Sequence, residues 1–241
     1  MWRYLNLTVI GIVMVVGCRY YHQDISILES VPYVEYGCGT SPDPLDGPIG
    51  FGVGAKRINT STDIDTSINA FGPDLLIRRR FSKVEVGYFA TNSLQKNHLL
   101  PYGILDLKVF IIDKPLLVAP DFAVGLGVGK AGFMFDGRSS LILGLSLFDG
   151  LVCPYVAPKA ILLFYPYEKS GIIPTLKWTG CGISGLSGGM GISIPLEVED
   201  ERVIRSVKFV PEVSYISGRE PKQNRIGFSV FQLGGRLIFT F

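Results

Sequence analysis

Residues 121–129 read Asp-Phe-Ala-Val-Gly-Leu-Gly-Val-Gly, and large apolar side chains alternate with small ones. The even positions carry Phe, Val, Leu and Val, whereas the odd positions carry Asp, Ala and three glycines. Successive side chains of a β-strand point to opposite faces, so this stretch predicts a strand with one apolar face and one small or polar face. A solvated sheet would carry more Lys, Glu and Thr on its second face. The pattern is typical of a strand in a membrane β-barrel.

The same alternation recurs on both sides of this stretch, in segments 49–56, 104–112, 141–147 and 186–197. In segment 104–112, Asp106 and Lys108 share one face, and Leu105 and Leu107 lie on the other. We therefore expect Asp106 and Lys108 to point into the lumen of a barrel, where two opposite charges can pair. Lys159 is a third residue expected to face the lumen.

Turn residues divide the chain at fairly regular spacing. We expect a hairpin at 82–83 and further turns at 113–115, 136–137, 149–150, 167–171 and 218–224. The expected strands are 48–57, 74–81, 84–91, 102–112, 117–129, 139–148, 151–164, 172–181, 184–197, 204–217 and 226–241, with 31–37 as one more candidate. A closed single-chain bacterial barrel has an even strand number, about 10 or 12 here. The predicted fold class is all-β, an antiparallel up-and-down meander β-barrel of about 10–12 transmembrane strands.

Two segments fit this pattern less well. Pro154 and Pro158 weaken the strand expected at 151–164, because proline removes a ladder donor. The alternation survives them, since both share a face with Val156. In the last segment the apolar face changes phase near residue 230, and a β-bulge there would reconcile the two halves.

The front of the chain has a short apolar stretch, residues 9–17, after the basic Arg3. A spanning helix needs about 20 apolar residues, so this stretch fits a secretory signal peptide instead. Val15-Val16-Gly17-Cys18 resembles the lipobox of bacterial lipoproteins, in which the Cys is acylated and begins the mature chain. The alternative is an ordinary cleaved signal in which Cys18 is incidental. The resemblance implies a signal peptide at 1–17, a tether at 18–30 lipidated on Cys18, and one barrel domain at 31–241.

Two further segments resemble bacterial outer-membrane barrels. The end of the chain, QLGGRLIFTF, is similar to the terminal strand that the barrel assembly machinery reads, with Phe239 and Phe241 at the aromatic positions. Gly235 lies one position too early, and Arg236 takes its expected place. The hairpin at 78–88, RRRFSKVEVGY, is similar to hairpins in such barrels of unassigned function. The alternative for the last segment is the final core strand of a soluble sheet.

These resemblances imply a location and partners, but no specific activity. Arg19, directly after the lipobox, implies the outer membrane, because an Asp there favours retention in the inner membrane of proteobacteria. The implied partners are outer-membrane lipid and, during biogenesis, the barrel assembly machinery and the lipoprotein-processing enzymes.

Composition argues against several other classes. The net charge is +2, and the dense basic run Arg78–Arg80 lies in an expected strand, where it cannot form one flat patch. We therefore expect no nucleic acid partner. The two histidines and four cysteines show no clustered ligand pattern, so we expect no metal and no cofactor. If Cys18 carries lipid, three cysteines remain. One disulfide is then possible among Cys38, Cys153 and Cys181, and the sequence does not decide which pair forms it.

A lipid-modifying hydrolase or acyltransferase would need a nucleophile, a base and an orienting group. The candidates are Ser93, His98 and either Asp106 or Glu85. His98 lies in a loop-like stretch, where a solvated histidine is the commoner case. We expect no catalytic residues and no enzyme.

Three functions therefore compete. The first is a lipid-anchored outer-membrane β-barrel with a structural, small-pore or envelope assembly or transport role. The second is a periplasmic, lipid-tethered soluble β-barrel that binds an apolar ligand in the manner of a lipocalin. The third is an outer-membrane lipid-modifying enzyme that depends on His98. The glycine-rich, charge-poor second faces favour the first, and a barrel this narrow is too small for a wide general porin.

Overall fold

The computed structural model describes residues 21–24, 44–63, 67–95, 98–112, 114–129, 132–171, 175–196, 204–219 and 227–241. The signal segment, the lipobox with Cys18, residue Cys38 and the candidate strand 31–37 lie outside the described residues.

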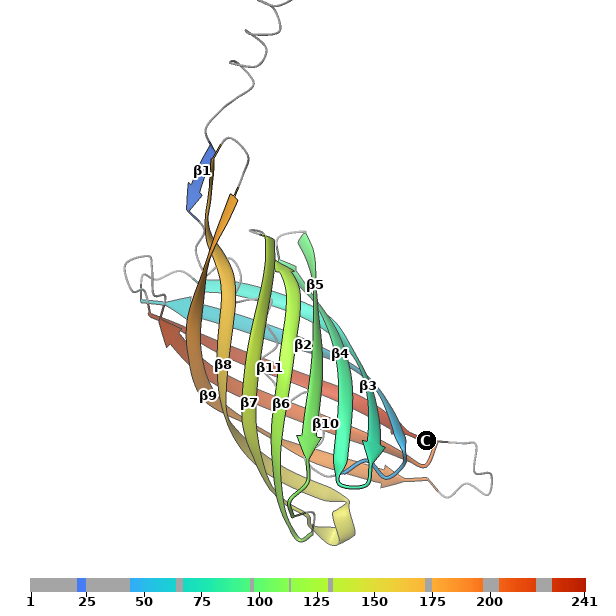
Figure 1. The fold of residues 1–241 in the computed structure, drawn as a ribbon. Helices are drawn as coiled ribbons and strands as arrows, with labels where there is room; N and C mark the ends of the chain where they lie inside the picture. The colour runs from blue at the N-terminus through green and yellow to red at the C-terminus, as the bar shows by residue number, and fades with distance from the viewer. Residues whose placement is uncertain are drawn as a thin grey trace, which may run out of the picture.

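The described chain is almost entirely β-strand (Figure 1). The strands are β1 (Tyr21–Asp24), β2 (Ile49–Thr62), β3 (Ser67–Phe81), β4 (Val84–Gln95), β5 (His98–Val109), β6 (Leu116–Gly129), β7 (Gly132–Leu145), β8 (Val152–Gly171), β9 (Thr175–Pro195), β10 (Ser206–Arg219) and β11 (Gly227–Thr240). One 3-10 helix, η3 (Phe148–Gly150), lies between β7 and β8.

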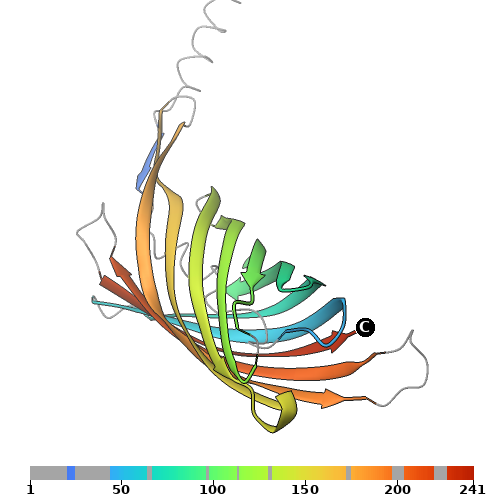
Figure 2. The same ribbon diagram turned by 60° about the horizontal axis from the view of Figure 1, so that its bottom comes forward.

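Strands β2 to β11 form a closed barrel. Each pairs antiparallel with its neighbour in the chain, and β11 pairs with β2 to close the ring. The strands wrap around a shared interior, which Figure 2 shows from a second direction. The fold is a closed ten-stranded antiparallel meander barrel. The predicted fold class is confirmed in its all-β architecture, its meander order and its even strand number.

The register also sets the tilt of the strands. A path through directly paired residues leaves β2 at Ser61, passes through all ten strands and returns to β2 at Ile49, which is twelve residues away (61 to 49). A ten-stranded barrel with this stagger has its strands tilted by about 40° from the barrel axis. Membrane barrels have tilts of about 35–45°.

The barrel has two distinct ends. At the turn end lie the Ser82–Lys83 hairpin turn, η3 and the C-terminal Phe241, and Ser82 adopts the positive φ of 54° that this tight turn requires. At the loop end, β2 connects to β3, β4 to β5, β6 to β7, β8 to β9 and β10 to β11. Strands β8 and β9 extend beyond their neighbours at the loop end (Figure 1).

Several expected boundaries were wrong. The segments 172–181 and 184–197 are one strand, β9, because Gly182 and Ile183 pair without a break with β8, and Ile183 pairs with β10 as well. The turn expected at 136–137 lies inside β7, and that expected at 167–171 lies inside β8. In each case pairing with neighbouring strands outweighs the local turn preference of Gly, Asp and Ser.

The β-bulge expected near residue 230 was also wrong. The pairing of β11 with β10 and with β2 runs in one register from Phe228 to Thr240. Phe228 and Val230 are buried inside the barrel, whereas Phe231 and Leu233 are exposed on its outside. The apolar residues change from even to odd positions because the lumen is itself apolar near the loop end of β11. The register of the strand does not change.

Candidate functional site

A band of exposed apolar side chains encircles the outer wall. Every barrel strand contributes to it, and we call it the apolar belt. One member from each strand is Val53, Leu75, Tyr88, Leu105, Val124, Leu141, Val156, Leu186, Val213 and Leu233. Exposed apolar surface costs about 25 cal/mol per Å² in water, and continuous patches this large mark interaction surfaces. The belt therefore needs an apolar environment around it.

Aromatic residues lie near both edges of the belt. Phe71 and Tyr215 are exposed toward the loop end, and Phe81 and Phe241 are exposed toward the turn end. Beyond Phe71 on the same strand the outward face becomes polar at Asn69. Aromatic girdles at both boundaries of an apolar band are a feature of membrane barrels.

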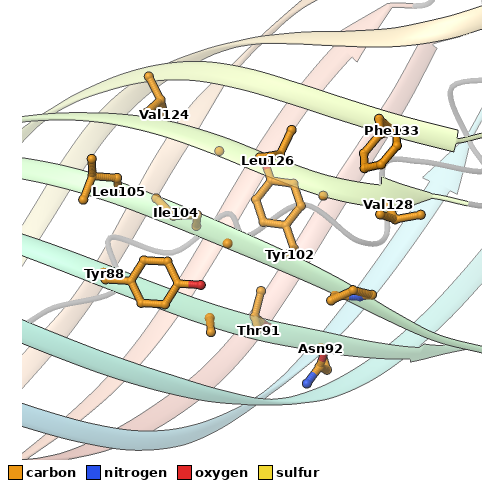
Figure 3. A pocket seen from close by; sticks show the side chains of 15 residues that line it. Tyr88, Thr91, Asn92, Tyr102, Ile104, Leu105, Val124, Leu126, Val128 and Phe133 are labelled. Carbon is orange, nitrogen blue, oxygen red and sulfur yellow. The ribbon is translucent and has the colours of Figure 1, made fainter.

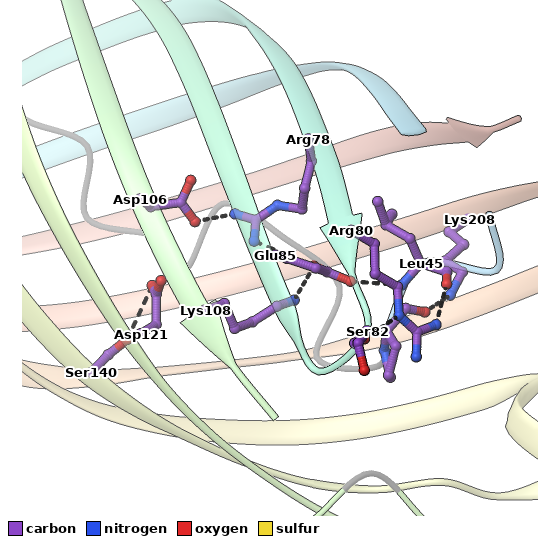
Figure 4. Close-up of polar contacts among 11 residues, drawn as sticks. Leu45, Arg78, Arg80, Ser82, Glu85, Asp106, Lys108, Asp121, Ser140 and Lys208 are labelled. Atoms are coloured by element: carbon purple, nitrogen blue, oxygen red, sulfur yellow. Dashed lines mark hydrogen bonds and ion pairs between the residues drawn. The ribbon is translucent and has the colours of Figure 1, made fainter. Parts of the chain in front are cut away.

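The inside of the wall carries a cluster of charges on four adjacent strands, β3 to β6 (Figure 4). We call Arg78, Glu85, Asp106, Lys108 and Asp121 the lumen charge cluster, and all five are buried. Arg78 binds both Asp106 and Glu85, the latter at 3.3 Å between Nη1 and Oε2. Lys108 Nζ lies 3.1 Å from the same Glu85 oxygen. Period-two alternation on neighbouring strands brings these charges to one face.

The cluster fits because glycine faces it. A Cβ at Gly87 would collide with Asp106 Oδ1 and would lie 2.7 Å from Arg78 Nη2. Within the described part of the chain, Arg78 Nε, Asp106 Oδ1 and Asp121 Oδ1 have no hydrogen-bond partner. Buried polar atoms are normally satisfied, so these three atoms leave unmet hydrogen-bonding capacity inside the wall.

A second ion pair explains the glycine face of β2. Arg236 on β11 donates from Nε to Asp74 Oδ1 and from Nη2 to Asp74 Oδ2, both at 2.9 Å. Strand β2 lies between their strands, and a Cβ on its Gly52 or Gly54 would crowd the pair, at 3.1 Å from Arg236 Cδ or 2.5 Å from Asp74 Oδ1. The small residues alternating in 49–56 therefore make room for a bidentate ion pair that crosses a strand.

The lumen-facing candidates from the sequence take the following positions. Asp106 is 7% exposed and Lys108 is 1% exposed, both on the inner face of β5. Their ion-pair partners in Figure 4 lie on β3 and β4, rather than being each other along β5. Lys159 is half-buried, in the inward phase of β8 set by the buried Ala157 and Ile161.

Sequence reasoning missed most of the charged interior, namely Arg78, Glu85, Asp136, Arg138, Asp74 and Arg236. The sequence does carry a pattern that would have revealed them. In DLLIRRRF, Asp74 and Arg78 are an even number of residues apart, so their side chains share one face of the strand, and Leu75 and Ile77 lie on the other face. Arg79 has that outward phase and stacks over the ring of Phe81 at 4.9 Å. The arginine run is therefore divided between the two faces of the wall.

The last two aromatic residues lie at the turn end. Phe239 pairs with Phe51 on β2 and with Val207 on β10. The backbone N–H of Phe241 donates to Ile49 O at 3.0 Å. Recognition of Phe239 and Phe241 by the assembly machinery stays a prediction.

The hydrolase candidates are not brought together. His98 is the first residue of β5, and Asp106 lies eight residues further along the same strand, about 26 Å away. Glu85 pairs with Lys108, which is further still from His98. Ser93, opposite Leu100, is near His98 in the ladder, but neither proposed acid can orient that histidine.

Cys153 and Cys181 are both buried and lie far apart. Cys181 is opposite Leu163, which is ten residues from Cys153 on β8, or about 33 Å along the strand. A disulfide needs Cα atoms within about 7 Å, so this pair is excluded. Pairings with Cys38 lie outside the described residues.

A groove of about 670 Å³ indents the outer wall over β4 to β7 (Figure 3). Ala90 and Gly103, which pair directly, are small residues in its lining, and larger side chains such as Tyr88, Leu126 and Phe133 surround them. In the described ranges no group of three or more His, Cys, Asp and Glu could hold a metal ion. No helix of the described chain is both long and apolar enough to span a membrane.

No family model and no curated protein matches the sequence. Among solved structures the barrel resembles Neisserial surface protein A, at 12% identity and a TM-score of 0.39 over 81% of this chain and 98% of that one. It also resembles the β-domain of the Bordetella autotransporter BrkA, at 11% identity and a TM-score of 0.36 over 80% and 100%. The attachment invasion locus protein Ail of Yersinia pestis matches at 12% identity and a TM-score of 0.31 over 79% and 97%. These similarities are too distant to assign a family.

Proposed function

We propose that this protein is a bacterial outer-membrane β-barrel with a structural role in the cell envelope, anchored additionally by lipid on Cys18. The observation that carries the proposal is the apolar belt, which encircles all ten barrel strands. Its polarity is that of a membrane barrel, with apolar side chains outside and charges inside.

The height of the belt supports the same conclusion. On β6 the exposed apolar residues extend from Leu116 to Leu126, ten residues or about 33 Å along the strand. At a tilt of about 40° this corresponds to a height of about 25 Å, the height of the apolar band in outer-membrane barrels.

The interior favours a structural role over an open pore. Lys56, Lys108 and Lys208 are at most 2% exposed, and so is Arg78, although all four lie inside the barrel wall. The Asp74–Arg236 and Tyr155–Glu212 contacts add further polar links across the inner face. Ten strands enclose a narrow lumen, which these side chains fill at several levels.

The periplasmic lipocalin-like alternative needs the opposite polarity, with a solvated outer wall around an apolar cavity. The belt weighs against it, because residues such as Val124 and Leu126 are 60% exposed on the outside. The lipid-modifying enzyme is weaker still, since His98 and Asp106 lie far apart on β5.

The test is the mobility of the membrane-extracted protein in SDS gels, unboiled against boiled, for the wild type and Cys18→Ala. Both should shift on heating, and Cys18→Ala should remain with the membrane pellet, because the belt holds the barrel without the lipid. A Cys18→Ala protein that is released into buffer and shows no shift would favour the tethered soluble barrel.

A further inference from the structure

The first described strand lies at the loop end of the barrel. β1 pairs antiparallel with the far end of β8, in a register that matches Tyr21 to Gly171 and Asp24 to Glu168. Figure 1 shows β1 beside the part of β8 that extends beyond the neighbouring strands. The C-terminal Phe241 lies at the opposite, turn end, where its N–H is bonded to Ile49.

The register gives the height of β1 above the belt. On β9 the belt reaches the exposed Trp178, which is opposite Pro166 of β8. Pro166 lies five residues before Gly171, about 17 Å along the strand and roughly 13 Å along the barrel axis. Tyr21 is therefore held roughly 13 Å above the loop-side edge of the belt, and roughly 40 Å from its turn-side edge.

Chain length then limits where Cys18 can go. Cys18 is three residues before Tyr21, and three residues span at most about 10 Å. From β1 the Cys18 backbone can approach the loop-side boundary of the belt, but the turn-side boundary is out of its reach. We infer that β1 holds the mature N-terminus at the loop end, so that acyl chains on Cys18 enter the membrane leaflet on the loop side. The inference rests on the proposed function.

The chain is fixed again at the turn end before it enters β2. Lys208 Nζ donates to Pro44 O at 2.8 Å, and Arg80 Nη1 donates to Leu45 O at 2.6 Å. The Leu45 N–H donates to Glu85 Oε1 at 2.8 Å, which ties this segment to the lumen charge cluster. Asp24 and Pro44 therefore lie at opposite ends, and the twenty residue steps between them reach at most about 70 Å, more than the roughly 50 Å length of the barrel. A single chain can join both points.

Impermeant maleimide labelling of intact cells tests the inference. The variants are Gln23→Cys in β1, Arg219→Cys at the loop end of β10 and Lys83→Cys in the turn-end hairpin, with Cys38, Cys153 and Cys181 changed to Ser. We expect Gln23→Cys and Arg219→Cys to react on intact cells and Lys83→Cys to react only after permeabilisation. Reaction of Arg219→Cys without Gln23→Cys overturns the position of the N-terminus and leaves the barrel proposal standing. Equal labelling of all three variants on intact cells overturns the proposed membrane orientation itself.

A cross-link tests the β1 register independently of the membrane. Gln23 and Lys169 are directly paired, so Gln23→Cys with Lys169→Cys should form a disulfide under mild oxidation. The matched control pairs Gln23→Cys with Lys83→Cys at the other end, and it should not cross-link. Only variants that keep the heat shift in SDS gels are scored. A folded Gln23→Cys/Lys169→Cys variant that stays reduced overturns the placement of β1.

Discussion

Arg236 on β11 and Asp74 on β3 form a bidentate ion pair that crosses the intervening strand β2, with both hydrogen bonds at 2.9 Å. Both side chains are more than nine-tenths buried. The pair also places the Arg236 guanidinium 4.4 Å from the ring centre of Phe89 on β4. These contacts join β11, β3 and β4 across β2, around the point where the barrel closes.

Adding one methyl group beneath this pair should destabilise the barrel. In Gly54→Ala the new Cβ would crowd Asp74 Oδ1 and lie 2.7 Å from Gly235 O, a backbone atom that cannot move away easily. Gly182→Ala is the matched control, because its Cβ would meet nothing within 4 Å. We expect the temperature of the gel shift to fall for Gly54→Ala and to stay unchanged for Gly182→Ala. Equal temperatures for the two variants would contradict this account of the glycine face.

Removing one partner of the pair should cost more than removing both. Asp74→Leu leaves the Arg236 charge buried without its carboxylate, a loss of about 3–5 kcal/mol in comparable buried pairs. The double variant Asp74→Leu/Arg236→Met removes both charges and should recover most of that loss. Denaturant unfolding in detergent micelles measures the cycle, and additive losses would show that the two residues do not act as a pair.

The apolar belt predicts a depth-dependent cost of charge on one strand. Leu75→Arg puts a charge in the middle of the belt on β3 and should destabilise the membrane-inserted barrel by about 2–4 kcal/mol. Asn69→Arg is exposed on the same outer face nearer the loop end and should cost about 0–1 kcal/mol. Folding titrations into lipid vesicles report both values. Similar costs at the two positions would argue that the belt does not contact hydrocarbon.

The filled lumen predicts little ion conduction. Buried Arg78, Lys108 and Lys208 occupy the interior at the levels where a pore would have to pass. The purified barrel in planar bilayers should therefore show no steady open-channel current. A stable ohmic conductance would contradict the structural role and would favour a small pore through the same barrel.

Much of this architecture was readable from local patterns. The alternation in 121–129 correctly separated the exposed Phe122, Val124 and Leu126 from the buried Asp121 and Ala123. It succeeded because the direction of a side chain in a strand depends only on its position in the strand. The merged strand β9 and the absent bulge near 230 were not readable in the same way. They depend on ladders with other strands, which local turn and phase signals do not report.

The sequence by itself determined the all-β class and the outward direction of belt residues such as Phe122 and Val124, because period-two alternation is a property of neighbouring residues. Only the tertiary structure decided that ten strands close the ring, that Arg78 meets Asp106, and that Arg236 reaches Asp74 across β2. It also placed β1 beside the far end of β8. These relationships join residues distant in the chain, and their partners follow from strand register and barrel closure, which no local pattern encodes.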